Sequence, residues 1–402
     1  MPDSNAIPVD RREFLQVGAA ATAAVGLAGS GSALAQDRTG QLRPILPTRA
    51  LGKTGVEVTL LTQGTVDQPD ALDRLIRVAY REGVRYFDTA EGYRNSEKVI
   101  GDWLKAAPEV RKTIFLATKS GVGTPSDMLK KVDARLERLN TDYIDLLFFH
   151  GLETSQVDWP KSREMRQAIE AIKKTGKVKF VGFSTHDQSI AQQLSNAAEG
   201  GFVDAIMLMF NPWLDKDSPL NKALDACHKR GIGLVSMKQL AGQALKLAAD
   251  SAPALKARGL TPIQGILHAI WTDERFSSSC VTMRNTDQTR EDVDAARRFV
   301  PLKQAELDEL RAAVLAAGPT LCPNCDGRCS AAAGTKANLC DLARFYTYHE
   351  DHEMRGHARD CYTGLSAEGR NWKGADLEAA RAACHHKIDF ARLLPEADRL
   401  LG

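Results

Sequence analysis

Short apolar runs and amphipathic stretches alternate along most of the chain. The short runs predict buried β-strands, and apolar residues that recur every three or four positions predict helices packed on one face. The expected strands cover residues 60–65, 84–87, 113–118, 143–149, 179–183, 205–210, 233–237 and 277–283. The expected helices cover residues 71–82, 96–104, 125–139, 162–174, 188–198, 220–229, 261–271 and 290–299.

This alternation predicts an α/β fold, the (β/α)8 TIM barrel. Eight strand–helix units of about 30 residues each are what such a barrel requires. Residues 56–61, after Gly55, predict a strand hairpin that closes the barrel floor. A doubly wound sheet would carry Gly-x-Gly-x-x-Gly after an early strand, and the chain has no such motif there.

Several of the predicted strands end in ionisable residues. Asp88 ends the strand at 84–87, and Tyr93 follows five positions later. Lys119 and His150 end two further apolar strands. Burying such groups is expensive unless they are paired or take part in chemistry. In a parallel barrel all four would meet at the C-terminal mouth, where active sites of this fold lie.

At these positions the chain resembles the aldo-keto reductases, over roughly residues 49–300. The resemblance rests on the Asp88-to-Tyr93 spacing and on Leu51-Gly52-Lys53-Thr54-Gly55, Ala117-Thr118-Lys119 and Phe148-Phe149-His150. It implies a catalytic tetrad of Asp88, Tyr93, Lys119 and His150. The alternative for Asp88 and Lys119 is a purely structural ion pair.

The chemistry of this tetrad can be built from its residue types. A carbonyl group that accepts hydride at carbon needs a proton at oxygen, which Tyr93 would donate. A free phenol has a pKa of about 10, and a nearby Lys119 cation is expected to lower it. Asp88 would hold Lys119, and His150 would hydrogen-bond the carbonyl oxygen. Neither a Cys or Ser nucleophile nor a metal is required.

Side chains cannot supply hydride, so the reaction needs a cofactor. The resemblance implies a nicotinamide dinucleotide across the barrel mouth. Gly64 and Thr65 match the turn beside the nicotinamide, and Ser184 and Thr185 match the pair that holds its carboxamide. The other cofactor candidates are Asn211, Met237, Lys238, Arg284, Asn285 and Gln288.

Two features of these candidates bear on the cofactor. Met207 and Met237 stand where many relatives have Gln and Tyr, and Lys238 could reach a phosphate. The cationic loop 284–290 favours NADPH over NADH, because relatives bind the adenosine 2′-phosphate there. The alternative is a solvated loop without a ligand.

The chain divides into four expected segments. Residues 1–35 resemble a twin-arginine signal peptide, with Arg11-Arg12 before an Ala-rich apolar run and Ala33-Leu34-Ala35 as a cleavage site. The alternatives are a basic helix or a membrane anchor. Residues 36–48 are a linker, residues 49–317 the barrel and residues 318–402 a cysteine-containing tail. The twin-arginine machinery would be a partner, and the mature protein would be periplasmic.

The tail carries most of the eight cysteines of the 402-residue chain. Cys322, Cys325 and Cys329 are closely spaced, and Cys384 lies far downstream. The tail resembles the ferredoxin-like extension of some aldo-keto reductases, so these four thiolates could hold one [4Fe-4S] cluster. Zinc on three cysteines with Cys384 or His385 is the main rival, and a disulfide is a third option.

Composition narrows the function further. The net charge of +2 gives no indication of nucleic-acid binding. The first hypothesis is an NADP(H)-dependent oxidoreductase acting on a small carbonyl or alcohol substrate. The second is an iron–sulfur redox protein that uses the barrel for binding, with an electron-transfer partner. Export favours either tight cofactor retention or another electron donor, because reduced nicotinamide cannot be assumed to be replenished outside.

The remaining candidates have modest expected roles. Trp213 is expected to line the substrate pocket or to pack in the core. The other thiols are interpreted as small buried hydrophobes; they are Cys227, Cys280, Cys340 and Cys361. Residues 342–348 and 377–383 predict helices, and His349, His352 and His357 are expected on an exposed helix.

Overall fold

The structure is a computed structural model that describes most of the chain from Leu42 onwards. The described residues are 42–66, 71–210, 212–214, 216–240, 247–248, 250–320, 322, 327–351 and 354–402. The expected signal peptide, residues 1–35, lies outside them. Leu46 is buried against the barrel core and Thr48 begins strand β1, so the last residues of the expected linker belong to the folded unit.

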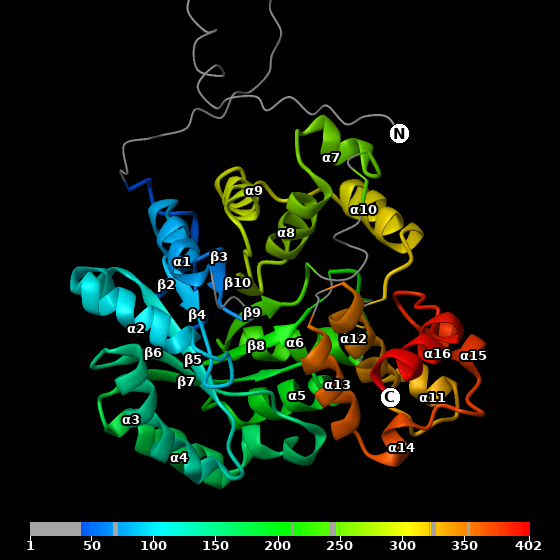
Figure 1. Ribbon diagram of the computed structural model, residues 1–402, viewed down its shortest axis with the longest axis horizontal. Coiled ribbons are helices and arrows are strands. Elements are labelled where there is room, and N and C mark those ends of the chain that lie inside the picture. Colours follow the sequence, from blue (N-terminus) through cyan, green and yellow to red (C-terminus); the bar gives the residue numbers. More distant parts are fainter. Residues whose placement is uncertain are drawn as a thin grey trace, which may run out of the picture. The chain divides into compact units, whose positions relative to one another are not determined.

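Eight parallel strands close into a barrel, which confirms the predicted fold (Figure 1). Neighbouring strands pair in chain order, and β10 closes the ring between β9 and β3. The strands are β3 (Leu61–Gly64), β4 (Tyr86–Asp88), β5 (Phe115–Ser120), β6 (Ile144–Phe149), β7 (Val178–Thr185), β8 (Ala205–Met209), β9 (Gly233–Met237) and β10 (Phe276–Val281).

Helices follow the strands at the expected places. They are α1 (Leu72–Arg81), α2 (Ser96–Ala106), α3 (Met128–Leu139), α4 (Arg163–Lys174), α5 (Ile190–Gly200), α6 (Pro219–Lys229), α8 (Pro262–Thr272) and α9 (Thr286–Arg297). The sequence pattern did not predict α7 (Pro253–Ala257) or α10 (Gln304–Ala316) as separate helices. Helix α9 begins earlier than expected because the Asn285 side chain accepts hydrogen bonds from the backbone N–H groups of Asp287 and Gln288.

Strand alternation separates two cores and fixes which side chains face the barrel interior. Phe87 of β4 packs outward in the core beneath the helices, whereas its neighbour Tyr86 packs inside the barrel. Successive side chains of a strand point to opposite faces. Asp88, two residues after Tyr86, therefore faces inward at the C-terminal end of β4.

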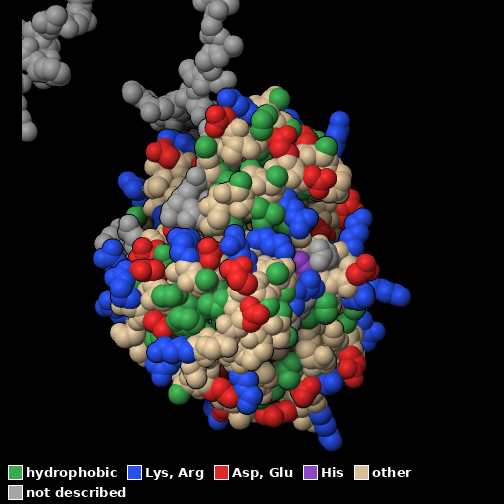
Figure 2. Space-filling view, turned by 90° about the vertical axis from the view of Figure 1, so that its right-hand side faces the viewer, with side chains coloured by type: hydrophobic (Ala, Val, Ile, Leu, Met, Phe, Trp, Pro, Cys, Tyr) green, Lys and Arg blue, Asp and Glu red, His purple; other side chains and the backbone are tan. Residues whose placement is uncertain are grey.

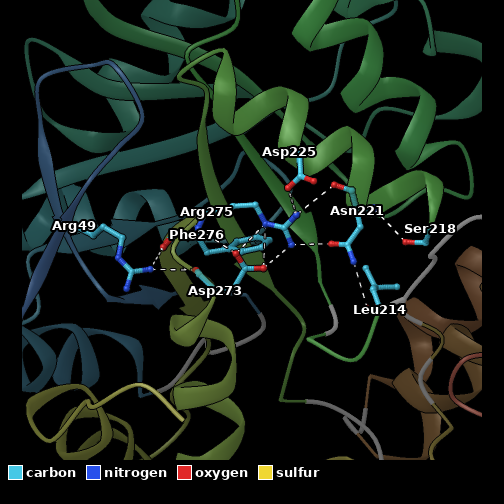
Figure 3. Close-up of polar contacts among 8 residues, drawn as sticks. All are labelled: Arg49, Leu214, Ser218, Asn221, Asp225, Asp273, Arg275 and Phe276. Carbon is cyan, nitrogen blue, oxygen red and sulfur yellow. Dashed lines mark hydrogen bonds and ion pairs between the residues drawn. The ribbon is translucent and has the colours of Figure 1, made fainter. Parts of the chain in front are cut away.

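The predicted hairpin is present as an antiparallel pair of β1 (Thr48–Ala50) and β2 (Glu57–Thr59). Figure 3 shows how β1 is tied to the segment before β10: Arg49 donates to the carbonyl oxygens of Asp273 (3.3 Å) and Phe276 (2.6 Å). Arg49 also donates to the carbonyl oxygen of Trp271 at 2.9 Å. On the other side of this segment, Arg275 donates to Asp225 and to Asn221 of α6, both at 2.7 Å. These bonds fix the start of the last barrel strand.

The tail forms a helical extension with a core of its own, drawn in orange to red in Figure 1. Its helices are α11 (Arg328–Ala332), α12 (Leu339–Glu350), α13 (Arg355–Gly364), α14 (Ala367–Arg370), α15 (Leu377–Ala383) and α16 (Phe390–Leu401). Figure 2 shows the face on this side of the molecule, where acidic and basic side chains are interspersed. In the part of the chain described, no helix has the length and apolar character needed to cross a membrane.

The expected exposed histidine helix is correct only in part. His357 on α13 is exposed, but His349 on α12 is buried, and its Nδ1 lies 2.8 Å from a carboxylate oxygen of Glu350. Helix α12 is buried on nearly all sides because it packs against both α13 and α16. His352 lies outside the described residues.

Candidate active site

The four side chains singled out from the sequence come together at the C-terminal end of the barrel. Lys119 on β5 forms a hydrogen-bonded ion pair with Asp88 on β4, and both side chains are almost completely buried. Lys119 also donates to the carbonyl oxygen of Thr89 at 2.9 Å. Its Nζ lies 5.1 Å from the ring centroid of Tyr93, and that ring is edge-on to His150 with centroids 5.6 Å apart.

The Asp88–Lys119 pair fixes a positive charge beside the phenol. Burial raises the pKa of Asp88, and the Lys119 cation acts in the opposite direction. Burial is the largest single influence on Lys119 and disfavours its charge, but Asp88, Tyr93 and Cys280 together outweigh burial and raise the pKa of the ammonium group. Lys119 therefore remains a cation over the whole neutral range.

The net effect on Tyr93 is the reverse of the sequence-based expectation. Lys119 does lower the pKa of the phenol, as expected, but burial of the hydroxyl is the larger influence and Asp88 acts with it. Together they raise the pKa of Tyr93 to about 12. Tyr93 thus keeps its proton at neutral pH, and a developing alkoxide is still a strong enough base to accept it.

His150 is neutral in this environment. Burial, and then the positive charges of Lys119 and Lys238, lower the pKa of its imidazole to about 3. A neutral imidazole has one N–H group with which it can hydrogen-bond a carbonyl oxygen, and it is a poor proton donor in the acid–base sense. The two rings therefore suit different tasks: Tyr93 proton transfer and His150 orientation.

Sequence reasoning missed two contacts that support the tetrad. The Cys280 thiol of β10 lies 3.7 Å from the Asp88 carboxylate and is a weak donor to it. Behind β5, the buried Glu97 carboxylate accepts from Thr118 at 2.7 Å and pairs with Arg135 at 3.0 Å. Nothing in the local sequence marks these residues, because the contacts depend on strand order and helix packing.

The residues expected beside the nicotinamide form a close cradle at the ends of β3 and β4. Gly64 pairs in register with Asp88, and a Cβ atom there would lie 3.1 Å from the Cys280 Sγ. Buried polar atoms at these ends have no hydrogen-bond partner within the described chain: Thr65 Oγ1, Thr89 Oγ1 and Asp88 Oδ1. Since buried polar groups are normally satisfied, these atoms suit a polar group of a bound molecule.

The pair expected to hold the carboxamide is engaged with the loop after β6. Ser184 Oγ accepts from the backbone N–H of Gly151 at 2.9 Å, and Thr185 Oγ1 donates to the carbonyl oxygen of Leu152 at 3.1 Å. Ser184 can still donate its hydroxyl hydrogen. Met237 lies at the C-terminal end of β9 and packs against the barrel interior, and Asn211 lies outside the described residues.

The remaining cofactor candidates lie at two places. Lys238, directly after β9, donates to the hydroxyl of Tyr348 on α12. Arg284, Asn285 and Gln288 gather at the N-terminus of α9, where the Gln288 side chain accepts from the Arg284 backbone N–H at 2.8 Å. A helix N-terminus beside an arginine favours a phosphate group.

Three of the four predicted metal-binding cysteines are described, and all three are buried in the core of the extension: Cys322, Cys329 and Cys384. Burial, together with the neighbouring Cys322 and Cys384, raises the pKa of the Cys329 thiol to about 12. Cys340, interpreted from sequence as a buried hydrophobe, is buried, and its thiol donates to the side-chain oxygen of Asn338 at 2.8 Å. Among the described residues no group of three or more side chains has the arrangement of a metal site, and no disulfide is present; Cys325 lies outside them.

Other sequence-based expectations have mixed outcomes. Trp213 is buried in a cluster with residues of α7, α8 and α10, such as Leu255 and Leu310, which agrees with the packing interpretation. Cys227 is buried, as expected. Cys361 is only partly buried, and its Sγ lies 3.5 Å from His357 Nε2, so it is not a simple core residue.

Comparison with known sequences agrees with this geometry. The sequence pattern of the Aldo/keto reductase family matches residues 58–314. The chain therefore belongs to the aldo/keto reductase family, whose members are oxidoreductases that act on carbonyl and alcohol groups.

Three relatives illustrate the range of the similarity. An L-galactose dehydrogenase of Arabidopsis thaliana is 29% identical over 66% of this chain and 93% of its own length. A 6-dehydroglucose reductase of Novosphingobium aromaticivorans is 30% identical over 37% of this chain and 55% of its own length. An NADH-specific methylglyoxal reductase of Escherichia coli is 27% identical over 42% of this chain and 56% of its own length.

Proposed function

We propose that this protein is an NADP(H)-dependent oxidoreductase that interconverts a small carbonyl compound and its alcohol. The observation that carries the proposal is the buried Asp88–Lys119 ion pair beside the Tyr93 ring, with His150 edge-on to the same ring. This arrangement places a proton donor, a fixed cation and a neutral hydrogen-bond donor around one point. A bound nicotinamide dinucleotide would supply the hydride.

Each side chain has one task in carbonyl reduction. His150 donates a hydrogen bond that orients the carbonyl oxygen toward Tyr93. Tyr93 transfers its hydroxyl proton to that oxygen as negative charge develops there. Lys119 stabilises the phenolate that remains, and Asp88 keeps the lysine charged and in place. In alcohol oxidation the same phenolate takes the proton back.

The cofactor would be held at the ends of the strands. Gly64, which has no side chain, would let the nicotinamide approach the backbone closely. Thr65, Ser184 and Thr185 would offer hydroxyl groups to the cofactor. The N-terminus of α9, with Arg284, Asn285 and Gln288, suits an adenosine 2′-phosphate. This supports NADPH as the preferred cofactor, with Met237 and Asn211 as further candidates.

The rate of carbonyl reduction is expected to be nearly independent of pH between about pH 5 and pH 9. His150, with a pKa of about 3, is neutral throughout this range, and Tyr93, with a pKa of about 12, is protonated throughout it. The measurement is kcat for an aldehyde at saturating NADPH as a function of pH. A break near pH 6.5 that disappears in His150→Gln would show that the imidazole titrates during turnover and would contradict these roles.

For the tail, we propose that the cysteine cluster holds one [4Fe-4S] cluster through Cys322, Cys325, Cys329 and Cys384. The proposal is supported by burial of three of these cysteines in one small core and by their ligand spacing. A metal would have to displace the thiol protons, so its binding would be coupled to proton release.

Anaerobic purification followed by iron, sulfide and zinc analysis is expected to give about four irons per chain, lost in Cys325→Ser. Cys227→Ser is the matched control, because that thiol lies in the barrel core. Stoichiometric zinc without sulfide would show that the cysteines bind a structural zinc ion and not an iron–sulfur cluster. Absence of both metals would remove the second candidate function, an iron–sulfur redox protein with an electron-transfer partner.

We also propose that the protein reaches the periplasm folded, by the twin-arginine route. The support is the pair Arg11-Arg12 before the apolar run. The double substitution Arg11→Lys and Arg12→Lys is expected to retain the precursor in the cytoplasm, as measured by cell fractionation and immunoblotting. Unchanged fractionation of the double variant would exclude this route.

A further inference from the structure

Helix α12 of the extension is attached to the same end of the barrel as the proposed active site. Arg344 donates to the carbonyl oxygen of His186, directly after β7, at 2.6 Å. Tyr348 accepts from Lys238, directly after β9. Arg344 and Tyr348 are four residues apart and share one face of α12. A segment outside the family match thus presents a tyrosine to the barrel mouth.

Lys238 and Tyr348 contact each other closely at the barrel mouth. The Lys238 ammonium lies 4.5 Å from the ring centroid of Tyr348, which is itself almost fully buried. Lys238 directly follows the C-terminal end of β9, and its contact with Tyr348 lies at the same end of the barrel as Tyr93 and His150. The positive charge of Lys238 is one of the influences that lower the pKa of His150, after burial and Lys119.

The cationic side chains at this end of the barrel differ in whether a carboxylate neutralises them. Lys119 is paired with Asp88, and Arg344 is paired with Asp341 at 2.5 Å. Lys238 is partly buried and has no carboxylate partner among the described residues. Its backbone also adopts a positive φ of 62°, a conformation that L-residues rarely take except where the surroundings impose it. A partly desolvated cation without a counter-ion favours an anionic ligand.

We propose that Lys238 and Tyr348 form a subsite for a carboxylate group of the substrate. The Lys238 ammonium has two further N–H donors beyond the one directed at Tyr348, which holds it in place. A carboxylate could accept from the ammonium, and such charge-assisted bonds are among the stronger ones. The proposal rests on the proposed function, and it extends that function to carbonyl compounds that carry an acidic group.

The test uses two aldehydes, 4-formylbenzoate, which carries a carboxylate, and methyl 4-formylbenzoate, its neutral methyl ester. The measured quantity is the ratio of kcat/KM for the acid to that for the ester. Lys238→Met is expected to lower this ratio by about tenfold or more, the loss expected for a charge-assisted bond. Lys238→Arg should largely restore it, and Tyr348→Phe should lower it by a smaller factor. An unchanged ratio in Lys238→Met would overturn the proposal.

A matched control is available at a distance from this site. Lys179 also lies over a tyrosine ring, that of Tyr143, with Nζ 4.2 Å from the ring centroid, near the start of β7. Lys179→Met should leave the ratio unchanged. The affinity for NADPH, from fluorescence titration, separates the two sources of an anion. If Lys238→Met weakens NADPH binding and both aldehydes suffer equally, Lys238 serves a phosphate of the cofactor and the proposal fails.

A binding measurement separates failure of this proposal from failure of the proposed function. Wild-type protein that reduces neither aldehyde would count against the reductase function. Calorimetric titration with 4-(hydroxymethyl)benzoate and its methyl ester would then still test the subsite. Preference for the acid that is lost in Lys238→Met supports it, and equal binding of acid and ester by the wild type overturns it.

Discussion

Tyr93→Phe is expected to lower kcat for carbonyl reduction by a factor of about 10² to 10⁴, the usual contribution of a positioned proton donor. The substitution removes only the hydroxyl group. The ring keeps its edge-on contact with His150 and its position beside Lys119. Binding of NADPH and the midpoint of urea unfolding should therefore remain close to those of the wild type.

Tyr80→Phe is the matched control for this prediction. It also removes one phenol hydroxyl, which lies 2.9 Å from Thr113 Oγ1 on the outer surface of the barrel. This variant should keep its activity. If Tyr93→Phe reduces an aldehyde as fast as the wild type does, Tyr93 is not the proton donor.

Lys119→Met is expected to abolish activity and to lower the free energy of unfolding by about 3–5 kcal/mol. The reason for the loss of stability is that the substitution leaves the Asp88 carboxylate buried without its counter-ion. Protonation of Asp88 removes the buried, unpaired negative charge. The pKa of Asp88 in the folded variant should therefore rise above its pKa in the unfolded chain. Stability would then be retained at low pH and lost as the pH rises. Urea unfolding at pH 5 and pH 8 should show the larger deficit at pH 8.

The double variant Asp88→Asn/Lys119→Met separates structure from chemistry. It replaces a buried ion pair by neutral groups of similar size, which should recover much of the stability. Activity should remain lost, because no cation stabilises the phenolate of Tyr93. Lys98→Met is a surface control: its pair with Asp102 is exposed and should contribute less than about 1 kcal/mol. If the double variant recovered turnover, the Asp88–Lys119 pair would have a structural role and no role in catalysis.

The sequence by itself determined the barrel and the position of the four side chains proposed to carry its chemistry. Parallel strands end at one face, so Asp88, Lys119 and His150, each at the end of an apolar run, had to lie at the same mouth. The five-residue spacing then allowed Tyr93 to reach them. Local signals also fixed the start of α8, where Thr261 caps the helix and Pro262 opens it.

Only the tertiary structure decided the electrostatics of these groups and which other side chains contact them. The sequence predicts that Lys119 lowers the pKa of Tyr93, but the depth of burial, which no local pattern specifies, is the larger influence and reverses the net shift. Cys280 reaches Asp88 because β10 closes the ring beside β3. Tyr348 reaches Lys238 because α12 packs on the barrel about a hundred residues later in the chain, a contact set by the packing of whole helices.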